Sequence, residues 1–330
     1  MLDIIIIGGG PIGLACALQA QKAGFNFVIL EKGTLVNSLY NYPTTMTFFS
    51  TSEKLEIGGF PFATTHPKPN RADALEYYRR VALSQNLPLK LFEEVTEVTR
   101  SDGKYHVATT KGIYEAKYVI VATGFYDICV NLDIPGEDLP KVRHYYQDPH
   151  FYTLQKVVVV GASNSSVDVA LETYRKGAEV TMVVRGNEIG TRVKYWVRPD
   201  IVNRIKEGTI KAYFNSSLKA IREYEVDIET PDGIVTIPND YVMAMTGYKP
   251  NFDFLSKIGI RLSEDGKYIP TYNANTMETN LPGVYLAGVV VGGMDTHLWF
   301  IENSRIHAEM ILQDIVNKEN QRNAYLRYDD

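Results

Sequence analysis

Two stretches of this chain have the form of a nucleotide-binding turn, in which a short apolar strand runs through a turn of small residues into a helix. The first is Gly8-Gly9-Gly10-Pro11-Ile12-Gly13 after the apolar run 4–7, and the second is Gly161-Ala162-Ser163-Asn164-Ser165-Ser166 after the run 157–160. A helical pattern and another strand follow each turn. The sequence therefore predicts two βαβ units, each on a parallel sheet.

The first turn has the spacing G-x-G-x-x-G and an acid at the end of the next strand. Its first glycine allows the tight turn, its second lets a pyrophosphate approach the backbone, and its third lets the helix pack on the strand. Glu31 stands where an acid binds ribose hydroxyls and disfavours a 2′-phosphate. The predicted site suits FAD or NAD, and its binding residues are Gly8, Gly10, Pro11, Ile12, Gly13, Glu31 and Lys32.

The second turn has serine where the template has its later glycines. Serine is small enough for close approach and has a hydroxyl that can donate to phosphate. The strand after this turn ends at Arg185, and Arg192 and Lys194 follow. Cations at this place suit the 2′-phosphate of NADPH, although a solvated surface charge is the alternative for Arg185. The predicted binding residues are Gly161, Ser163, Asn164, Ser165, Ser166, Arg185 and Arg192.

Length and charge limit the other classes. The chain has 330 residues and a net charge of −5, which suggests two domains and gives no sign of binding to nucleic acid or a membrane surface. Its apolar runs are far shorter than the roughly 18 residues of a membrane helix. Cys16 and Cys129 are its two cysteines. They do not form a C-x-x-C pair, and we expect a cytoplasmic protein.

The order of elements predicts that one domain is inserted in the other. We expect an α/β fold with two Rossmann-like, three-layer domains: residues 1–122 and 247–330 bind FAD, and residues 123–246 bind NADPH. The pattern predicts single elements in three places, namely a helix over 71–84, a strand over 89–98 and a long amphipathic helix over 298–318. Residues 39–67 form an irregular stretch that is long enough to suggest a functional loop.

Further strings resemble the thioredoxin reductase-like flavoproteins, which bind two dinucleotides. Ala122-Thr123-Gly124 and Met245-Thr246-Gly247-Tyr248-Lys249-Pro250 resemble the two motifs where the chain crosses between domains. Residues 279–288, ending in Leu286-Ala287-Gly288, are similar to the C-terminal FAD motif. Tyr40-Asn41-Tyr42-Pro43, Thr47-Phe48-Phe49-Ser50 and Phe300-Ile301-Glu302-Asn303 are most similar to the bacillithiol-disulfide reductase family.

This resemblance implies FAD at the first turn, NADPH at the second and a homo-oligomer. It covers essentially the whole chain. Aromatic residues of the irregular stretch could cover the flavin ring, with core packing as the alternative. The further residues that we expect at the cofactors are Tyr40, Tyr42, Thr47, Phe48, Val95, Ala122, Thr123, Gly124, Gly247, Gly288 and Val289.

Three departures from the family pattern concern the chemistry. Residues 144–148 stand where thioredoxin reductases carry C-x-x-C, so no dithiol can relay electrons. Val289 replaces the usual aspartate, so contacts to the ribityl chain must come from backbone. Ile12 replaces the cysteine that is typical of the bacillithiol family. Cys16, one helical turn further, and His297 are weak catalytic candidates, because packing and surface roles are the more usual ones for such residues.

The sequence leaves three functions open. The chain reduces a low-molecular-weight disulfide such as bacillithiol disulfide with NADPH, or it passes electrons from NADPH to flavodoxin or ferredoxin. The third possibility is a redox-sensing module that binds NADPH without turnover. We expect the disulfide reductase.

Overall fold

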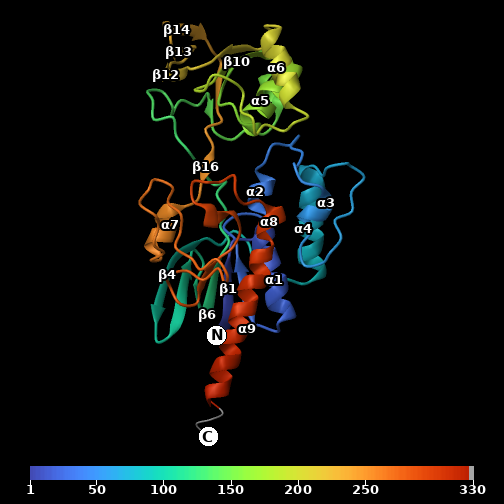
Figure 1. Ribbon diagram of the computed structural model, residues 1–330, viewed down its shortest axis with the longest axis vertical. Coiled ribbons are helices and arrows are strands. Elements are labelled where there is room, and N and C mark those ends of the chain that lie inside the picture. The colour runs from blue at the N-terminus through green and yellow to red at the C-terminus, as the bar shows by residue number, and fades with distance from the viewer. Residues whose placement is uncertain (327–330) are drawn as a thin grey trace. The chain divides into compact units, whose positions relative to one another are not determined.

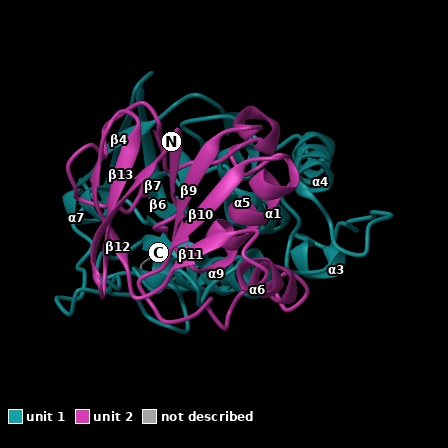
Figure 2. Ribbon diagram, turned by 90° about the horizontal axis from the view of Figure 1, so that it is seen from above, with its two compact units in different colours: residues 1–40, 46–128, 248–330 teal, residues 41–45, 129–247 magenta. Residues whose placement is uncertain are grey.

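The computed structural model describes residues 1–326, which form two compact units. Unit 1 contains residues 1–40 and 46–128 and the chain from residue 248 onward, and unit 2 contains residues 41–45 and 129–247 (Figure 2). Unit 2 is thus inserted in the sequence of unit 1. Nothing in the sequence pattern indicates that residues 41–45 belong with unit 2.

Unit 1 is built on a seven-stranded sheet of order β3-β2-β1-β6-β5-β4, with β17 paired to β6. At its centre β1 (Leu2–Ile7) pairs in parallel with β2 (Phe27–Leu30) and β6 (Ile113–Val121). Ile4, Ile5 and Ile6 are fully buried, as the continuous apolar run requires for a strand covered on both faces. The other strands are β3 (Leu89–Lys90), β4 (Val95–Ser101), β5 (Lys104–Thr109) and β17 (Val284–Leu286).

Two helices of unit 1 lie side by side, α1 (Pro11–Lys22) and α9 (Ile306–Leu326) (Figure 1). Proline at the first position of α1 suits a helix start, because the missing N–H would have no partner there. α4 (Arg71–Ser84) begins at a capping box between Asn70 and Asp73. The short elements are α2 (Asn37–Tyr40), α3 (Ser52–Leu55), α7 (Phe252–Lys257), η2 (Gly288–Gly292) and α8 (Ile301–Ser304).

Two of the predicted elements of unit 1 are wrong, although the strand order follows the βαβ pattern. The strand predicted over 89–98 is two strands, because Phe92 has a φ of +54°, which a strand cannot accommodate. The helix predicted over 298–318 is two helices, the short α8, which begins at Ile301, and the long α9, which begins at Ile306. Asn303 holds the preceding chain outside the helix: its Oδ1 accepts from the Phe300 amide (2.7 Å) and its Nδ2 donates to the Leu298 carbonyl (2.8 Å).

Unit 2 repeats the pattern with a five-stranded parallel sheet of order β11-β10-β9-β15-β8. Apolar residues on its two faces form two buried clusters, one with α5 (Asn164–Arg175) and one with a three-stranded antiparallel sheet. The remaining elements are β8 (Val142–Arg143), η1 (Pro149–Tyr152), β9 (Lys156–Val160), β10 (Glu179–Val183), α6 (Arg198–Lys206), β11 (Lys211–Tyr213), β12 (Ser217–Ile221), β13 (Glu225–Thr230), β14 (Gly233–Pro238) and β15 (Tyr241–Ala244). The short strands β7 (Ile128–Cys129) and β16 (Tyr248–Lys249) pair with each other.

Residues 41–45 join unit 2 through two threonines. The amide and the hydroxyl of Thr44 donate to the Gln147 carbonyl at 2.9 and 3.1 Å. The Thr45 hydroxyl donates to Oε2 of Glu172 (2.7 Å), which also accepts from the Tyr146 hydroxyl (2.9 Å). Burial raises the pKa of Glu172, and these two donors oppose that rise. Hydrogen bonds therefore fix this short segment to α5 and to the chain before β9.

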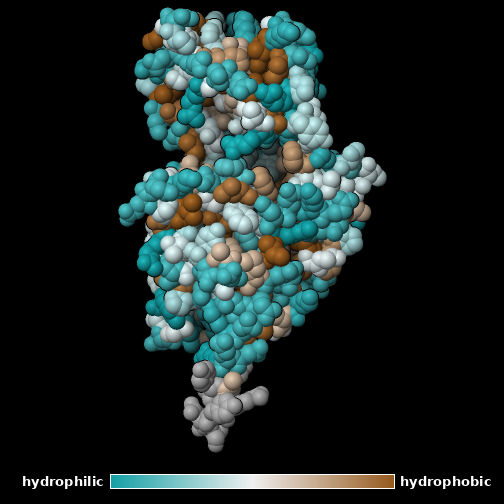
Figure 3. Space-filling view, in the orientation of Figure 1, coloured by the Kyte–Doolittle hydropathy of each residue, from teal (hydrophilic) through white to brown (hydrophobic). Residues whose placement is uncertain are grey.

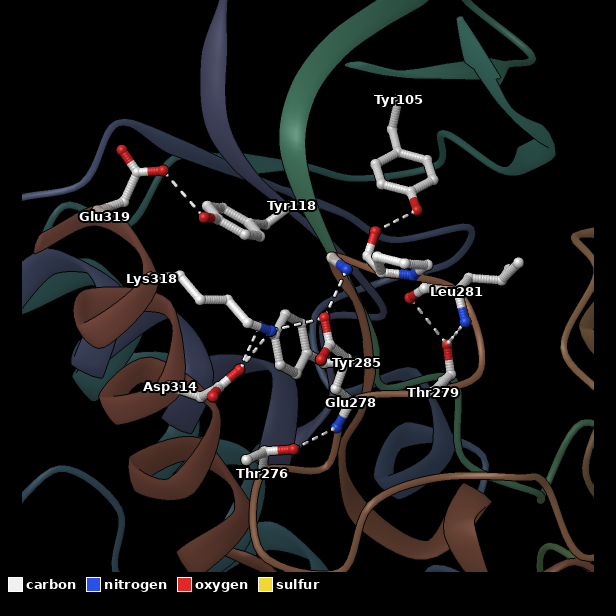
Figure 4. A network of polar contacts seen from close by, with 12 residues as sticks. Tyr105, Tyr118, Thr276, Glu278, Thr279, Leu281, Tyr285, Asp314, Lys318 and Glu319 are labelled. Carbon is white, nitrogen blue, oxygen red and sulfur yellow. Dashed lines mark hydrogen bonds and ion pairs between the residues drawn. The ribbon is translucent and has the colours of Figure 1, made fainter. Parts of the chain in front are cut away.

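A polar network attaches α9 to the last strand of the unit 1 sheet (Figure 4). The hydroxyl of the buried Tyr285 donates to Asp314 (2.7 Å) and accepts from Lys318 Nζ (2.9 Å). Lys318 also pairs with Glu278 (2.6 Å), which accepts from the Gly283 amide (2.7 Å). The network thus holds both the turn before β17 and the strand itself on the helix.

The molecular face drawn in Figure 3 is mostly hydrophilic, and its apolar residues form small separate patches. Over residues 1–326, no helix has the length and apolar character that crossing a membrane requires.

We expect Tyr285→Phe to lower the free energy of unfolding by about 1–3 kcal/mol, because Asp314 and Lys318 lose a buried partner. Tyr224→Phe is the matched control, since Tyr224 is 73% exposed and donates only to Glu223. It should change stability by less than about 0.5 kcal/mol. Urea unfolding measures both variants, and equal small losses would show that the network does not contribute.

Candidate functional site

The glycines of the first turn fulfil three different steric requirements. Gly8 has a φ of +111°, and a Cβ there would lie 2.5 Å from the Ala122 carbonyl oxygen. A Cβ on Gly13 would lie 1.9 Å from the Gly8 oxygen, so only glycine lets α1 pack so closely on the turn. A Cβ on Gly10 would meet nothing within 4 Å. The open side of Gly10, at the N-terminus of α1, is therefore where a pyrophosphate would approach.

Glu31 is bound to the turn itself. Its two carboxylate oxygens accept from the Gly9 amide (2.7 Å) and from the Gly33 amide (2.8 Å). The side chain is buried, which raises its pKa, and the two amides oppose that rise. A carboxylate has about four acceptor positions, so Glu31 can also accept from ribose hydroxyls. The same acid can thus shape the turn and bind the ligand.

A pocket of about 80 Å³ lies beside this turn. The hydroxyl oxygen of Thr123 is buried and has no hydrogen-bond partner among the described residues. An orphaned hydroxyl and an open glycine both fit a polar ligand such as the FAD dinucleotide. Lys32 forms an ion pair with Asp127 (2.9 Å) in the same wall. The predicted residues that line the pocket are Gly8, Glu31, Lys32, Val95, Thr123 and Gly124.

Gly288 and Ile12 meet on another side of the first turn. Gly288 follows β17 with a φ of +86°, and a Cβ there would lie 3.2 Å from Cγ1 of Ile12. The Gly288 amide donates to Nδ1 of His307 on α9 (3.1 Å). His307 is fully buried, and this burial lowers the pKa of its imidazole to about 4. No motif in the sequence points to His307, because its partner lies 19 residues earlier.

The other residues predicted at the flavin have varied environments. Phe48 is buried, whereas Tyr40 is 55% exposed. The Arg71 guanidinium lies over the Tyr40 ring, 5.4 Å from its centre. Thr47 forms an isolated bridge with Asn70. Tyr42 belongs to unit 2, as does Gly247, so the structure does not assign these two to the unit 1 site.

The two weak catalytic candidates have opposite environments. Cys16 is fully buried on α1, and burial raises the pKa of its thiol to about 12. At neutral pH it stays a thiol, which is a poor nucleophile. His297 is an exposed side chain in the chain before α8. Among the described residues, no group of three His, Cys, Asp or Glu side chains is placed to hold a metal ion.

The second turn achieves the same close packing with a serine. Gly161 has a φ of +121°, and a Cβ there would lie 3.2 Å from Cβ of Ser166. Ser166 is buried, and its hydroxyl donates to the Ser163 carbonyl (2.9 Å). The Ser166 hydroxyl thus bonds within the turn, and the expected place of Ser166 at NADPH stays a prediction. Ser163 and Ser165 are the exposed hydroxyls of the turn.

Asn164 fixes the loop that carries the predicted cations. Its Oδ1 accepts from the Lys194 amide (2.8 Å), and its Nδ2 donates to the Arg192 carbonyl (3.3 Å). The Lys194 ammonium pairs with Asp168 on α5 (2.8 Å). Arg185 and Arg192 are exposed. The chain at Arg192 and Lys194 is thus held at the N-terminus of α5, and together with the exposed Arg185 after β10 it fits a phosphorylated ribose.

Comparison with known proteins agrees with this geometry. The family model described as pyridine nucleotide-disulphide oxidoreductase matches residues 5–288. The chain is 45% identical over 319 residues to bacilliredoxin reductase Bdr of Bacillus subtilis, covering 96% of this chain and 98% of that protein. It also matches the structure of bacillithiol disulfide reductase Bdr from Bacillus cereus, with a TM-score of 0.94, 43% identity and coverage of 96% and 99%.

A more distant match concerns the fold alone. The structure of Lactococcus lactis thioredoxin reductase has a TM-score of 0.75 and 21% identity, covering 96% of this chain and 98% of that one. The chain belongs to the pyridine nucleotide-disulphide oxidoreductase family. This membership confirms the predicted α/β fold and the predicted class, a flavoprotein reductase that uses FAD and NADPH.

Two alanine variants separate the roles of the turn glycines. Gly10→Ala should fold normally, because its methyl meets no atom and its φ of −75° suits alanine, but it should bind FAD at least about tenfold more weakly. Gly13→Ala should lose about 3 kcal/mol or more of stability through overlap with Gly8. Urea unfolding of the apoprotein and FAD titration measure the two effects. Equal FAD affinity of Gly10→Ala and the native chain would contradict the approach of the pyrophosphate to the open side of Gly10.

The depressed pKa of His307 predicts a pH dependence of stability. The unfolded chain takes up this proton near pH 6.5, whereas the folded chain does so only near pH 4. The contribution of His307 to the free energy of unfolding is therefore fully present above pH 6.5 and is lost as the pH decreases toward 4. Relative to His307→Asn, the native chain should lose up to about 3 kcal/mol over this window. Urea unfolding at several pH values tests this, and parallel curves for the two proteins would contradict it.

Proposed function

We propose that this enzyme reduces a low-molecular-weight disulfide of the bacillithiol disulfide type with NADPH. The observation that carries the proposal is the 43% identity, over 96% of the chain, to a protein described as bacillithiol disulfide reductase. The overall reaction consumes one NADPH, one proton and one disulfide, and it yields NADP⁺ and two thiols. The disulfide gains the two electrons that NADPH loses.

FAD, when bound, supplies a group that accepts two electrons from NADPH and gives them to an acceptor. The first turn and the N-terminus of α1 would hold its pyrophosphate, and Glu31 its ribose. Contacts of Val289 to it would come from backbone, because the valine side chain offers no polar atom. In unit 2, Ser163, Ser165 and the exposed Arg185 and Arg192 would hold NADPH.

The first turn contributes no thiol to this reaction. Ile12 stands at the position where the bacillithiol family typically has cysteine, and it packs against Gly288. The buried Cys16 thiol is protonated at neutral pH. We therefore propose that the substrate disulfide is reduced without a covalent bond to a cysteine of α1 or its turn. The residues of this region position and shield the cofactor instead.

Steady-state NADPH consumption against a panel of acceptors tests the function. We expect turnover with bacillithiol disulfide and much slower oxidation with flavodoxin, ferredoxin or no acceptor. Faster turnover with flavodoxin or ferredoxin would replace the proposal with the electron-carrier alternative. NADPH binding without turnover on any acceptor would favour the redox-sensing module.

Cys16→Ala should keep NADPH-dependent flavin reduction within about twofold of the native rate, because the thiol is buried and uncharged. The same variant should keep turnover with bacillithiol disulfide. Stopped-flow absorbance follows the flavin, and NADPH absorbance follows turnover. Loss of disulfide turnover with intact flavin reduction would show that Cys16 takes part after all.

Arg185→Gln should weaken NADPH binding by about tenfold or more and leave NADH binding nearly unchanged, since a charge-assisted hydrogen bond to the 2′-phosphate is lost. Arg175→Gln is the control, because Arg175 is an exposed arginine of α5 that pairs with Asp200 (2.6 Å). Titration of both variants with each nucleotide gives the four affinities. Equal effects on the affinities for NADPH and NADH would show that Arg185 does not bind the 2′-phosphate.

A homo-oligomer in the cytoplasm stays part of the proposal. The sequence has two cysteines, Cys16 and Cys129, which form no C-x-x-C pair, and this agrees with a reducing compartment. Size-exclusion chromatography with light scattering gives the oligomeric state.

A further inference from the structure

We propose that His307 is a positioning residue of the flavin site, which holds the backbone at Gly288 and Val289 through the hydrogen bond from the Gly288 amide. This inference rests on the proposed binding of FAD in unit 1. It concerns a residue outside every motif that the sequence displays. The imidazole acts through the backbone and does not itself need to contact the cofactor.

The position of Gly288 is defined on two sides. On one side the Ile12 side chain packs closely, so that a Cβ on Gly288 would lie 3.2, 3.3 and 3.4 Å from three of its carbons. On the other side the amide donates to His307 Nδ1 at 3.1 Å. The residue therefore lies between the first glycine turn and α9. Movement of the imidazole would change the backbone that leads into Val289 and η2.

The hydrogen bond satisfies a group that would otherwise be buried without a partner. Gly288 is buried and its amide needs an acceptor, as nearly all buried N–H groups do. The chain also lacks the aspartate that usually follows this glycine, because residue 289 is valine. The Val289 side chain cannot make a polar contact with the ribityl chain of FAD. The contact would have to come from the backbone, so FAD binding depends on the course of the backbone here. The hydrogen bond to His307 helps to fix this course.

The imidazole itself is held in place. Trp299 meets it edge to face, with ring centres 4.6 Å apart and planes at 68°. Trp299 in turn packs on Gly292, where a Cβ would lie 3.2 Å from its Cδ1. Further along α9, the Tyr285 network fixes the helix to β17. His307 thus lies on a helix that is bound to β17, and it accepts a hydrogen bond from Gly288, which follows the same strand.

The geometry also fixes which nitrogen accepts. Nδ1 accepts from the Gly288 amide, so the proton of the neutral ring is on Nε2. Burial keeps this ring neutral over the physiological pH range. The acceptor is therefore present at neutral pH.

Three substitutions distinguish the hydrogen bond from simple packing. Asparagine places its Oδ1 at the same number of bonds from Cβ as Nδ1, whereas glutamine places its oxygen one bond further, and leucine has no acceptor. We expect His307→Asn to bind FAD within about threefold of the native affinity. His307→Gln and His307→Leu should bind FAD about tenfold or more weakly, because the Gly288 amide loses its partner.

The measurement is FAD titration of the apoproteins by flavin fluorescence, with the visible spectrum of the bound flavin as a second readout. Urea unfolding of each apoprotein shows whether a variant is folded. Weak binding by leucine and glutamine together with near-native binding and spectrum for asparagine supports the inference. Equal weakening in all three variants would reduce His307 to a packing residue, and native affinity of His307→Leu would also overturn the proposal.

The same experiment keeps this inference separate from the proposed substrate. FAD binding is measured without NADPH and without any disulfide. Suppose that the FAD affinities of the native protein and the variants follow the expected order, but that the native protein does not reduce bacillithiol disulfide. The substrate assignment then fails and the role of His307 stands. If the native protein reduces the disulfide while the leucine variant binds FAD normally, only the role of His307 fails.

Discussion

The contact of Gly13 with the carbonyl of Gly8 is the constraint on which the FAD unit depends. It brings α1 so close to the turn that a single methyl group would overlap the backbone. This closeness directs the N-terminus of α1 to the open side of Gly10 and leaves Gly9 within reach of Glu31. The ligand site is therefore a consequence of helix packing. The chain leaves the open space beside Gly10, where we propose that a phosphate binds, because it has no side chains where its backbone segments meet.

The two units meet this constraint by different means. Unit 1 uses glycine at both contact points, whereas unit 2 pairs Gly161 with Ser166 and satisfies the serine hydroxyl within the turn. The second turn consequently accepts a slightly larger residue at the third position. We propose that its selectivity depends on the loop at Arg192, whose backbone Asn164 holds. In the proposed sites the recognition of each dinucleotide comes from residues beyond the shared turn, namely Glu31 in one unit and Arg185 with Arg192 in the other.

The sequence predicts what local spacing encodes. The strands, both turns and Glu31 follow from periodicity and composition, and Gly288 from a resemblance of contiguous residues. The break at Phe92 depends on one backbone angle, and the delayed start of α8 on the side chain of Asn303, so neither interrupts the hydrophobic pattern. His307 could not be predicted because its role depends on α9 packing beside β17. The same holds for Ser166, whose hydroxyl is free in the sequence and occupied in the fold.

The threonines of segment 41–45 have a consequence for the modular nature of this chain. Because Thr44 and Thr45 satisfy Gln147 and Glu172, the inserted unit is not contained in one continuous stretch of sequence. A fragment that covers residues 129–247 alone lacks these donors to the Gln147 carbonyl and the half-buried Glu172 carboxylate. The chain therefore passes between the two units at both ends of segment 41–45 as well as at both ends of residues 129–247. Exchange of this unit between related proteins, by recombination or by design, must carry the five-residue segment with it.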